Sequence, residues 1–194
     1  MYNLLKQIEF IREIDKIKYI FRKTKLINSD RPENDAEHSW HLAVMAMVLA
    51  EYASEPIDLA KVIKMVLIHD IVEIDSGDVF MYSTEKNHDN FEEEQKAARR
   101  IFGILPEKQA EEFISIWLEF EEMKTPESKF ARAIDRLEPL LQNTSNKGGT
   151  WQEYDIKYSQ VMEKKQVIKE GSEELWKFAK QLIDASVEKG ILTP

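Results

Sequence analysis

The sequence contains no cysteine, and glycine and proline occur only six times each in 194 residues. Without cysteine there is no disulfide bond, no thiol nucleophile and no thiolate metal ligand, which fits a reducing compartment. No apolar run approaches the roughly 20 residues that a membrane-spanning helix needs. The first residues also lack the basic and apolar regions of a signal peptide. We therefore expect a cytoplasmic protein without a membrane partner.

The balance of charge is acidic, with a formal net charge of −9. Because contacts with phosphates dominate the affinity of proteins for nucleic acids, this charge argues against a surface that binds a nucleic acid polymer. It still permits one small anionic substrate that is held by a few local cations. The expected partner is therefore a small molecule.

Helix-forming residues are plentiful, and alternating β-branched runs bounded by turns are hard to find. These features predict an all-α protein with a single domain, residues 1–194, and no repeat or linker. The expected helices cover about 3–22, 34–52, 58–75, 90–103, 106–120, 125–141, 151–169 and 172–188. Asn34, Asp58, Asn90 and Thr125 are the expected N-caps.

The apolar side of each helix predicts the face that it buries. In the first helix this side is Leu4, Leu5, Ile8, Ile11 and Ile14, and a basic end that includes Arg22 follows. The later faces are Val44, Met45, Val48 and Leu49; Val62, Ile63, Val66 and Leu67; Phe113, Ile116, Trp117 and Phe120; and Phe130, Ile134, Leu137 and Leu141.

In residues 62–78 an apolar helical face becomes polar. Steps of three and four from Val66 lead to His69 and Asp70, and Glu73 lies one turn further on. A buried carboxylate without a partner is unfavourable, and the negative end of the helix dipole adds to the penalty. A divalent cation removes both problems. The alternative is a solvent-facing helix end with a hydrogen-bonded histidine, and the His69-Asp70 pair alone fits both interpretations.

Two further candidates come from other helices. His38 and His41 lie on successive turns of the helix after Asn34, so at least one of them begins on or beside its buried face. A lone histidine there is more often a hydrogen-bonded residue than a ligand. Asp135 flanks the apolar face of the helix that follows Thr125, and the sequence alone favours a surface ion pair with Arg132 or Arg136. His38 gains weight because a second histidine with acidic neighbours, His69, lies on the following helix.

Together, His38, His69, Asp70 and Asp135 form a mixed nitrogen and oxygen donor set that suits Mn, Fe, Co, Ni, Zn or Mg. Four such ligands leave positions for water on a six-coordinate ion, and water activated by a metal attacks phosphate esters. Glu73, one turn beyond Asp70, is then placed to orient or deprotonate that water.

Four segments, RPENDAEHS, IHDIVE, SGD and AIDRLEPL, resemble in this order the HD-domain phosphohydrolases. The sequence is most similar to the branch of bacterial 5′-deoxynucleotidases and their eukaryotic relatives, over about residues 17–141. The resemblance implies an HD-domain helical bundle, a divalent metal ion held by the four residues, and a homodimer. It also implies release of phosphate from deoxynucleoside 5′-monophosphates.

By the same matching, Glu73 activates the water, Asp78 lies near the sugar of the substrate, and Arg22 contacts its phosphate. Glu33 and Asn34 also match the motif, but we assign them no role beyond helix capping or contact with a metal-binding residue. Residues of about 151–189 match poorly, and we expect these helices to pack on the metal-site core and to form a dimer or close the pocket.

Three other functions remain open at this point. An HD phosphohydrolase can act on another nucleotide, such as a nucleoside polyphosphate or a cyclic nucleotide. An HD module can also bind a nucleotide without turnover, and a helical interaction domain can carry histidines that are only structural. His41 and His88 have no predicted role.

Overall fold

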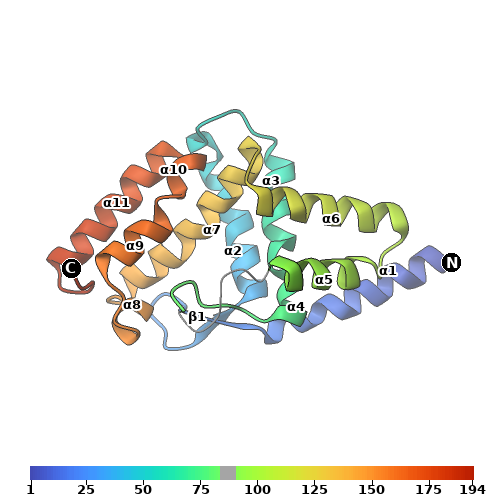
Figure 1. Cartoon of the computed structure of the whole chain (residues 1–194), viewed down its shortest axis with the longest axis horizontal. Coiled ribbons are helices and arrows are strands. Elements are labelled where there is room, and N and C mark those ends of the chain that lie inside the picture. Colours follow the sequence, from blue (N-terminus) through green and yellow to red (C-terminus); the bar gives the residue numbers. More distant parts are fainter. Residues whose placement is uncertain (84–90) are drawn as a thin grey trace.

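The computed structural model describes residues 1–83 and 91–194, which form an almost entirely helical molecule (Figure 1). The helices are α1 (Tyr2–Glu13), α2 (Asp35–Leu49), α3 (Leu59–Ile68), α4 (Glu73–Ser76), α5 (Phe91–Phe102), α6 (Glu107–Glu122), α7 (Pro126–Ser145), α8 (Thr150–Glu153), α9 (Tyr158–Lys165), α10 (Ile168–Gly171) and α11 (Glu173–Glu188). The predicted all-α class is confirmed. Within the described ranges, no helix combines the length and apolar character that a bilayer crossing requires.

The basic segment around Arg22 is a strand, so the prediction of one helix over about 3–22 is wrong. α1 ends at Glu13, a 3₁₀ segment covers Ile14–Tyr19, and β1 (Phe21–Lys25) pairs antiparallel with β2 (Pro32–Asn34). The pairing supplies the backbone hydrogen bonds that a helix would have made. It also brings Arg22 next to β2, which leads directly into α2.

The predicted helix starts hold where the structure describes them. Asn34, Asp58 and Thr125 each accept hydrogen bonds from backbone N–H groups in the first turn of their helices. Side chains of this kind satisfy donors that the helix itself leaves unpaired. Asn90, expected to cap α5, and His88 lie outside the described residues.

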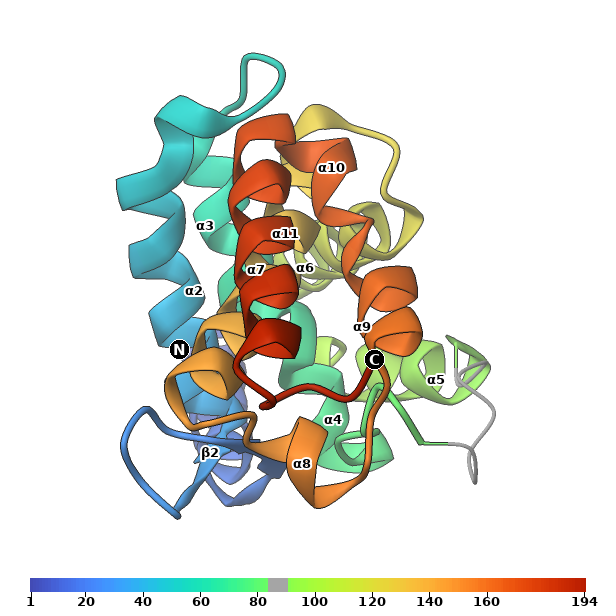
Figure 2. The ribbon, with the colours of Figure 1, turned by 90° about the vertical axis from the view of Figure 1, so that its left-hand side faces the viewer.

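The long helix α7 runs through the centre of the molecule between two groups of helices (Figure 1). α10 and α11 pack on α7 on one side, where α9 lies beside α10 and α11 (Figure 2), and α3 and α6 contact it on the other. The core confirms these predicted residues as buried: Met45, Val62, Val66, Ile116, Trp117, Phe120, Phe130, Ile134 and Leu137.

Val48 and Leu67 were expected in the core and are 65% and 44% exposed. Val48 lies in the apolar run Leu42–Leu49 of α2, so the period of apolar residues does not select one face there. On α3, Leu67 lies one step of three from Lys64, on the polar side of the helix. Neighbouring helices make the choice instead, and they cover Leu42 and Met65, which are both fully buried.

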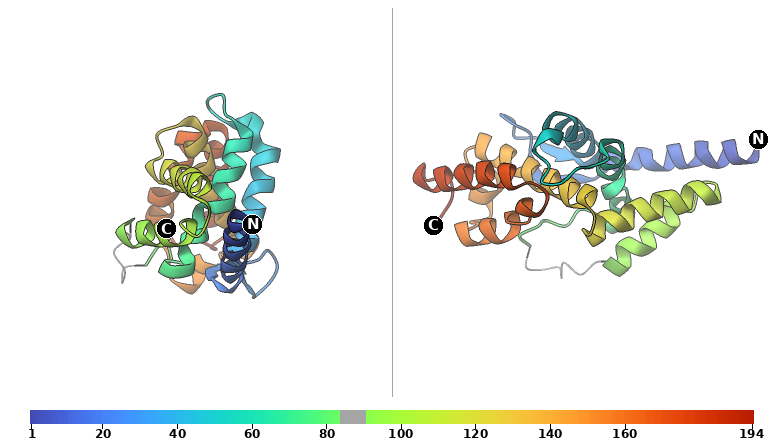
Figure 3. Two further views of the ribbon diagram at one scale, coloured as in Figure 1. Left: turned by 90° about the vertical axis from the view of Figure 1, so that its right-hand side faces the viewer. Right: turned by 90° about the horizontal axis from the view of Figure 1, so that it is seen from above.

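The apolar side of α1 is also exposed, contrary to the prediction. Leu4, Leu5, Ile8 and Ile11 lie on the surface, and the buried residue of this helix is Phe10. Its ring packs against Phe102 and Phe113, with centroids 6.4 and 5.7 Å away. α1 therefore rests on α5 and α6 by its other side, and its free end projects from the body of the molecule (Figure 3). Ile14, just beyond the helix, is partly buried against the core.

α10 lies so close to α7 that only glycine fits at the contact. A Cβ atom on Gly171 would lie 2.3 Å from the carbonyl oxygen of Lys129 and 2.8 Å from the Cα of Phe130. Both atoms belong to the backbone of α7, so neither can move aside cheaply. This contact ties the C-terminal helices to the helix at the centre.

We predict that Gly171→Ala lowers the free energy of unfolding by about 1–3 kcal/mol, because the added methyl group forces α10 away from α7. Urea denaturation followed by circular dichroism measures the change. The neighbouring exposed substitution Glu170→Ala should stay within about 0.5 kcal/mol of the wild type. We also expect one unfolding transition for residues 1–194, and two separate transitions would contradict a single domain.

Candidate metal centre

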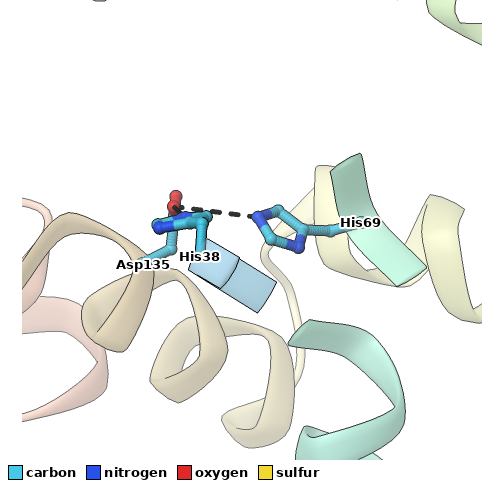
Figure 4. Close-up of side chains that lie close together, drawn as sticks. All are labelled: His38, His69 and Asp135. Carbon is cyan, nitrogen blue, oxygen red and sulfur yellow. Dashed lines mark hydrogen bonds and ion pairs between the residues drawn. The ribbon is translucent and has the colours of Figure 1, made fainter. Parts of the chain in front are cut away.

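Three predicted site residues, His38, His69 and Asp135, meet at one buried point, and the fourth, Asp70, lies beside them. α2 contributes His38, the 3₁₀ segment His69–Val72 contributes His69 and Asp70, and α7 contributes Asp135. The Oδ1 atom of Asp135 lies 3.1 Å from His38 Nε2 and 3.8 Å from His69 Nε2. Asp70 Oδ1 is 3.0 Å from His69 Nε2. Figure 4 shows the two rings and the Asp135 carboxylate pointing toward a common centre.

Each histidine has an outer partner that fixes its ring. His69 Nδ1 lies 3.0 Å from the carbonyl oxygen of Val66, so this nitrogen carries the proton and donates it. His38 Nδ1 lies 3.3 Å from carboxylate oxygens of both Glu33 and Glu138. These contacts fix the orientation of each ring and direct its Nε2 atom at the centre, which is how metal-binding histidines are held.

His69 Nε2 is a buried atom whose surroundings suit a bound cation. His69 Nε2 makes no hydrogen bond, although it is buried and Asp70 lies 3.0 Å away. A buried polar atom without a partner is unfavourable. Two imidazole nitrogens and carboxylate oxygens are donors that divalent transition metals and Mg accept. The residues present therefore fit a divalent metal ion.

The helix that carries the His69-Asp70 pair is not continuous, although one helix was expected over about 58–75. α3 stops at Ile68, a 3₁₀ segment follows, and α4 begins at Glu73. The imidazole of His69 takes the Val66 carbonyl, which in a regular α-helix would accept a backbone N–H. The polar pair thus interrupts the helix at the place where it faces the centre.

Asp135 combines both of its predicted environments. Its Oδ2 atom pairs with Arg136 at 3.3 Å and Arg132 at 3.7 Å, as the ion-pair interpretation expected, but the residue is buried and not on the surface. Burial by itself raises the pKa of Asp135, but Arg136 and His38 hold the pKa well below its usual value. Asp135 therefore stays charged, with Oδ1 free to face the centre.

Arg22 reaches the same region from β1. Its NH1 atom lies 3.0 Å from Asp70, 3.5 Å from Asp35 and 4.0 Å from Asp78, and its Nε atom lies 3.7 Å from Glu33. Burial disfavours the guanidinium charge, but the carboxylates raise the pKa of Arg22 well above its usual value. Its charge is therefore already balanced by acids of the protein.

A second acidic group lies beside the first centre. Asp35, Glu73 and Asp78 each place a carboxylate oxygen within 4.8 Å of the others. Burial raises the pKa of Asp35 to about 7 and the pKa of Glu73 well above its usual value, and Asp70 adds to both shifts. Such a group is also able to hold a cation, since a positive charge relieves the repulsion.

Sequence reasoning missed Asp35 and Glu138 and left His41 without a role. His41 Nδ1 lies 3.2 Å from Glu138, which also faces His38. Burial by itself raises the pKa of Glu138, but its bonds to the two histidines bring the pKa to about 2. The signal was spacing: Asp35 precedes His38 by three residues, and Glu138 follows Asp135 by three, so each pair shares one helical face.

A cavity of about 620 Å³ opens beside the centre, within the size range of small-molecule sites. Its lining combines acids, cations and aromatic rings: His69, Asp70, Asp135, Glu73, Asp78, Arg22, Arg136, Lys165, Phe80, Tyr82 and Phe120. The segment after Asp78 thus contributes two aromatic side chains, Phe80 and Tyr82, to this cavity.

Two imidazoles and two carboxylates from three segments of a helical molecule, next to a cavity, define a candidate metal site for a small ligand. Residues 14–176 match the family described as HD domain, and the chain belongs to that family. The match confirms the resemblance predicted from the motifs. It extends beyond the expected region of about 17–141 into the C-terminal helices.

Several known proteins are similar to this chain. The 5′-deoxynucleotidase HDDC2 of Homo sapiens is 28% identical over 136 residues, which span 70% of this chain and 65% of that protein. A crystal structure from Magnetospirillum magnetotacticum MS-1, described as a predicted metal-dependent phosphohydrolase, is 47% identical with a TM-score of 0.93. The match covers 99% of this chain and 96% of the chain in that crystal structure. The PH0347 protein of Pyrococcus horikoshii OT3 is 25% identical with a TM-score of 0.62, covering 92% and 97%.

We predict that Mn²⁺ stabilises the metal-free protein. Free Mn²⁺ at 100 times its dissociation constant should add about 2.7 kcal/mol, because only the folded state brings the ligands together. A thermal melt with and without the ion measures this as a rise in Tm. His69→Ala should remove the rise, and Glu170→Ala should keep it. Equal shifts in wild type and His69→Ala would place the ion elsewhere.

Proposed function

We propose that this protein is a metal-dependent 5′-nucleotidase that releases phosphate from (deoxy)nucleoside 5′-monophosphates. The observation that carries the proposal is the convergence of His38, His69 and Asp135, with Asp70 3.0 Å from His69, beside a cavity of about 620 Å³. Similarity to proteins named 5′-deoxynucleotidase supports the choice of substrate.

The proposed ligands of one divalent metal ion are His38, His69, Asp70 and Asp135. Their donor set is compatible with Mn, Co, Fe, Ni, Zn or Mg. When bound, the ion neutralises charge on phosphoryl oxygens and makes a water molecule more acidic. Asp70 also receives a hydrogen bond of 3.0 Å from Arg22, which holds its carboxylate in place.

Glu73 is the proposed base. Its carboxylate takes a proton from the attacking water, whose oxygen forms a bond to phosphorus while the bond from phosphorus to the 5′ oxygen breaks. The proton that Glu73 has taken passes to the leaving 5′ oxygen, so the products are a nucleoside and inorganic phosphate. Burial raises the pKa of Glu73, which makes its carboxylate a better proton acceptor near neutral pH.

Arg22 and Asp78 are the proposed contacts to the rest of the substrate. Arg22 would hold the phosphate, and Asp78 would accept a hydrogen bond from a sugar hydroxyl. Both residues line the cavity, and Arg22 lies 3.0 Å from the proposed ligand Asp70. Phe80 and Tyr82, whose rings lie 5.5 Å apart, offer apolar surface for the base.

We predict that Asp70→Ala abolishes phosphate release and leaves the far-ultraviolet circular dichroism nearly unchanged. Glu73→Gln should lower kcat by about 10²–10⁴-fold, the usual contribution of a general base, with bound metal retained. A malachite-green assay with a panel of ribo- and deoxynucleoside monophosphates measures both changes.

The same panel tests the choice of substrate. Nucleoside polyphosphates and cyclic nucleotides belong in it, because a cyclic diester yields a nucleotide and not free phosphate. If the folded, metal-loaded protein releases nothing from any monophosphate, the proposed reaction is wrong. Tight nucleotide binding without turnover would instead favour a binding module.

We also propose that the protein forms a homodimer through α1. Leu4, Leu5, Ile8 and Ile11 form an exposed apolar stripe on a helix that projects from the body of the molecule. Contiguous apolar surface of this kind marks interaction sites. A second copy of α1 offers an equally apolar stripe, as a twofold interface requires.

Light scattering after size-exclusion chromatography should give twice the chain mass of 22.8 kDa. We predict that Leu5→Glu with Ile8→Glu returns it to the mass of one chain, because charges in an apolar interface are unfavourable. Phe178→Glu is the control, since Phe178 is an exposed apolar residue on α11. A dimer that survives the α1 substitutions would place the interface elsewhere.

We propose a cytoplasmic location, where nucleoside monophosphates are available as substrates. The lack of cysteine in the sequence fits the reducing conditions there. Cell fractionation with an antibody against the protein tests this location directly.

A further inference from the structure

The cavity lining includes two neighbouring cations to which the reaction above assigns no role. Arg136 comes from α7, and Lys165 comes from the end of α9. The Nζ atom of Lys165 donates a hydrogen bond of 2.8 Å to the backbone carbonyl of Arg136. The two residues are therefore in direct contact, and we call them the α7–α9 patch.

Lys165 is only 1% exposed, and among the residues that the structure describes it forms no ion pair with a carboxylate. A lysine in the last turn of a helix usually serves the helix dipole. The ammonium of Lys165 instead bonds a carbonyl of a different helix. Burial and the neighbouring Arg136 lower the pKa of Lys165 to about 7. An anion in the cavity would make this position favourable for the ammonium.

Arg136 lies next to the metal centre. Its NH1 atom is 3.3 Å from Asp135 Oδ2, while Asp135 Oδ1 faces His38 Nε2 at 3.1 Å. A group bound at the centre is therefore close to the guanidinium of Arg136. The other arginine on this wall, Arg132, is already paired with Glu121 at 3.1 Å.

Arg22 differs from the α7–α9 patch in its surroundings. Four carboxylates lie within 4.0 Å of it, so its positive charge is already offset. A phosphate monoester carries about two negative charges near pH 7, so Arg22, whose charge is already offset, balances only part of this charge and leaves the rest to other cations. Arg136, in contrast, has one carboxylate within 4.0 Å in the described part of the chain, that of Asp135. The cations of α7 and α9 are therefore less fully offset than Arg22.

We propose that Arg136 and Lys165 bind the phosphoryl oxygens of the substrate that face away from the metal centre. This inference rests on the proposed function, since it seats a phosphate monoester in this cavity. The planar guanidinium of Arg136 suits two oxygens, and the ammonium of Lys165 suits one. Both charges would stabilise the negative charge that spreads over these oxygens during transfer.

Inorganic phosphate, the product, is the probe, because its binding is measured without turnover. Isothermal titration of phosphate into the Mn²⁺-loaded full chain measures the affinity. In Lys165→Met and in Arg136→Gln it should be at least about tenfold lower than in the wild type, as expected for lost hydrogen bonds to a charged group. Bound Mn²⁺ should stay at the wild-type level in both variants, and kcat/KM should fall by a similar factor. Lys169→Met, at an exposed lysine on α10, should change none of these quantities.

Lys165→Met separates binding from a structural role. Methionine has a similar length without the buried charge, so Tm should stay equal or rise while phosphate affinity falls. Wild-type phosphate affinity in both folded variants would overturn the proposal, as would a lower Tm of Lys165→Met with wild-type affinity. If phosphate binding depends on these residues but no monophosphate is hydrolysed, the patch stands and the proposed reaction fails.

Discussion

The structure depends on keeping the buried carboxylates of Asp135 and Glu138 charged inside a helical molecule. Asp135 shows how this is done: one of its oxygens faces two imidazoles, and the other faces two guanidinium groups. Buried charges are tolerated when cations surround them. Asp135 lies on α7, which runs through the centre of the molecule, and helices pack on both sides of α7.

The neighbours of the centre matter as much as its four central residues. Glu138 faces His38 and His41 together, and Glu33 approaches His38 from β2. Each contact fixes a proton on a known nitrogen or a charge on a known oxygen. The centre is therefore oriented before any ligand arrives, which is the condition for strong binding and for catalysis by positioned groups.

Local patterns in the sequence predicted the class of fold, most helix starts and the four residues to be considered together. They failed where the choice depends on distant neighbours. The second half of α2 is apolar all round, so its exposed residue Val48 could not be recognised, whereas Leu67 lies on the side of α3 that carries Lys64. β1 forms only because β2 pairs with it, and the stripe on α1 looks like a core face. The roles of the four central residues as metal ligands stay predictions.

The wide spacing of the central residues has a consequence for synthesis. His38 and Asp135 are separated by 97 positions, and the His69-Asp70 pair lies between them in the sequence. While the ribosome is still producing α6, the nascent chain already contains both histidines but not the carboxylate that joins them. Contacts between distant residues close late. Capture of a metal ion by the full set of residues must therefore wait until α7 has emerged, so the centre is completed only with the last third of the chain.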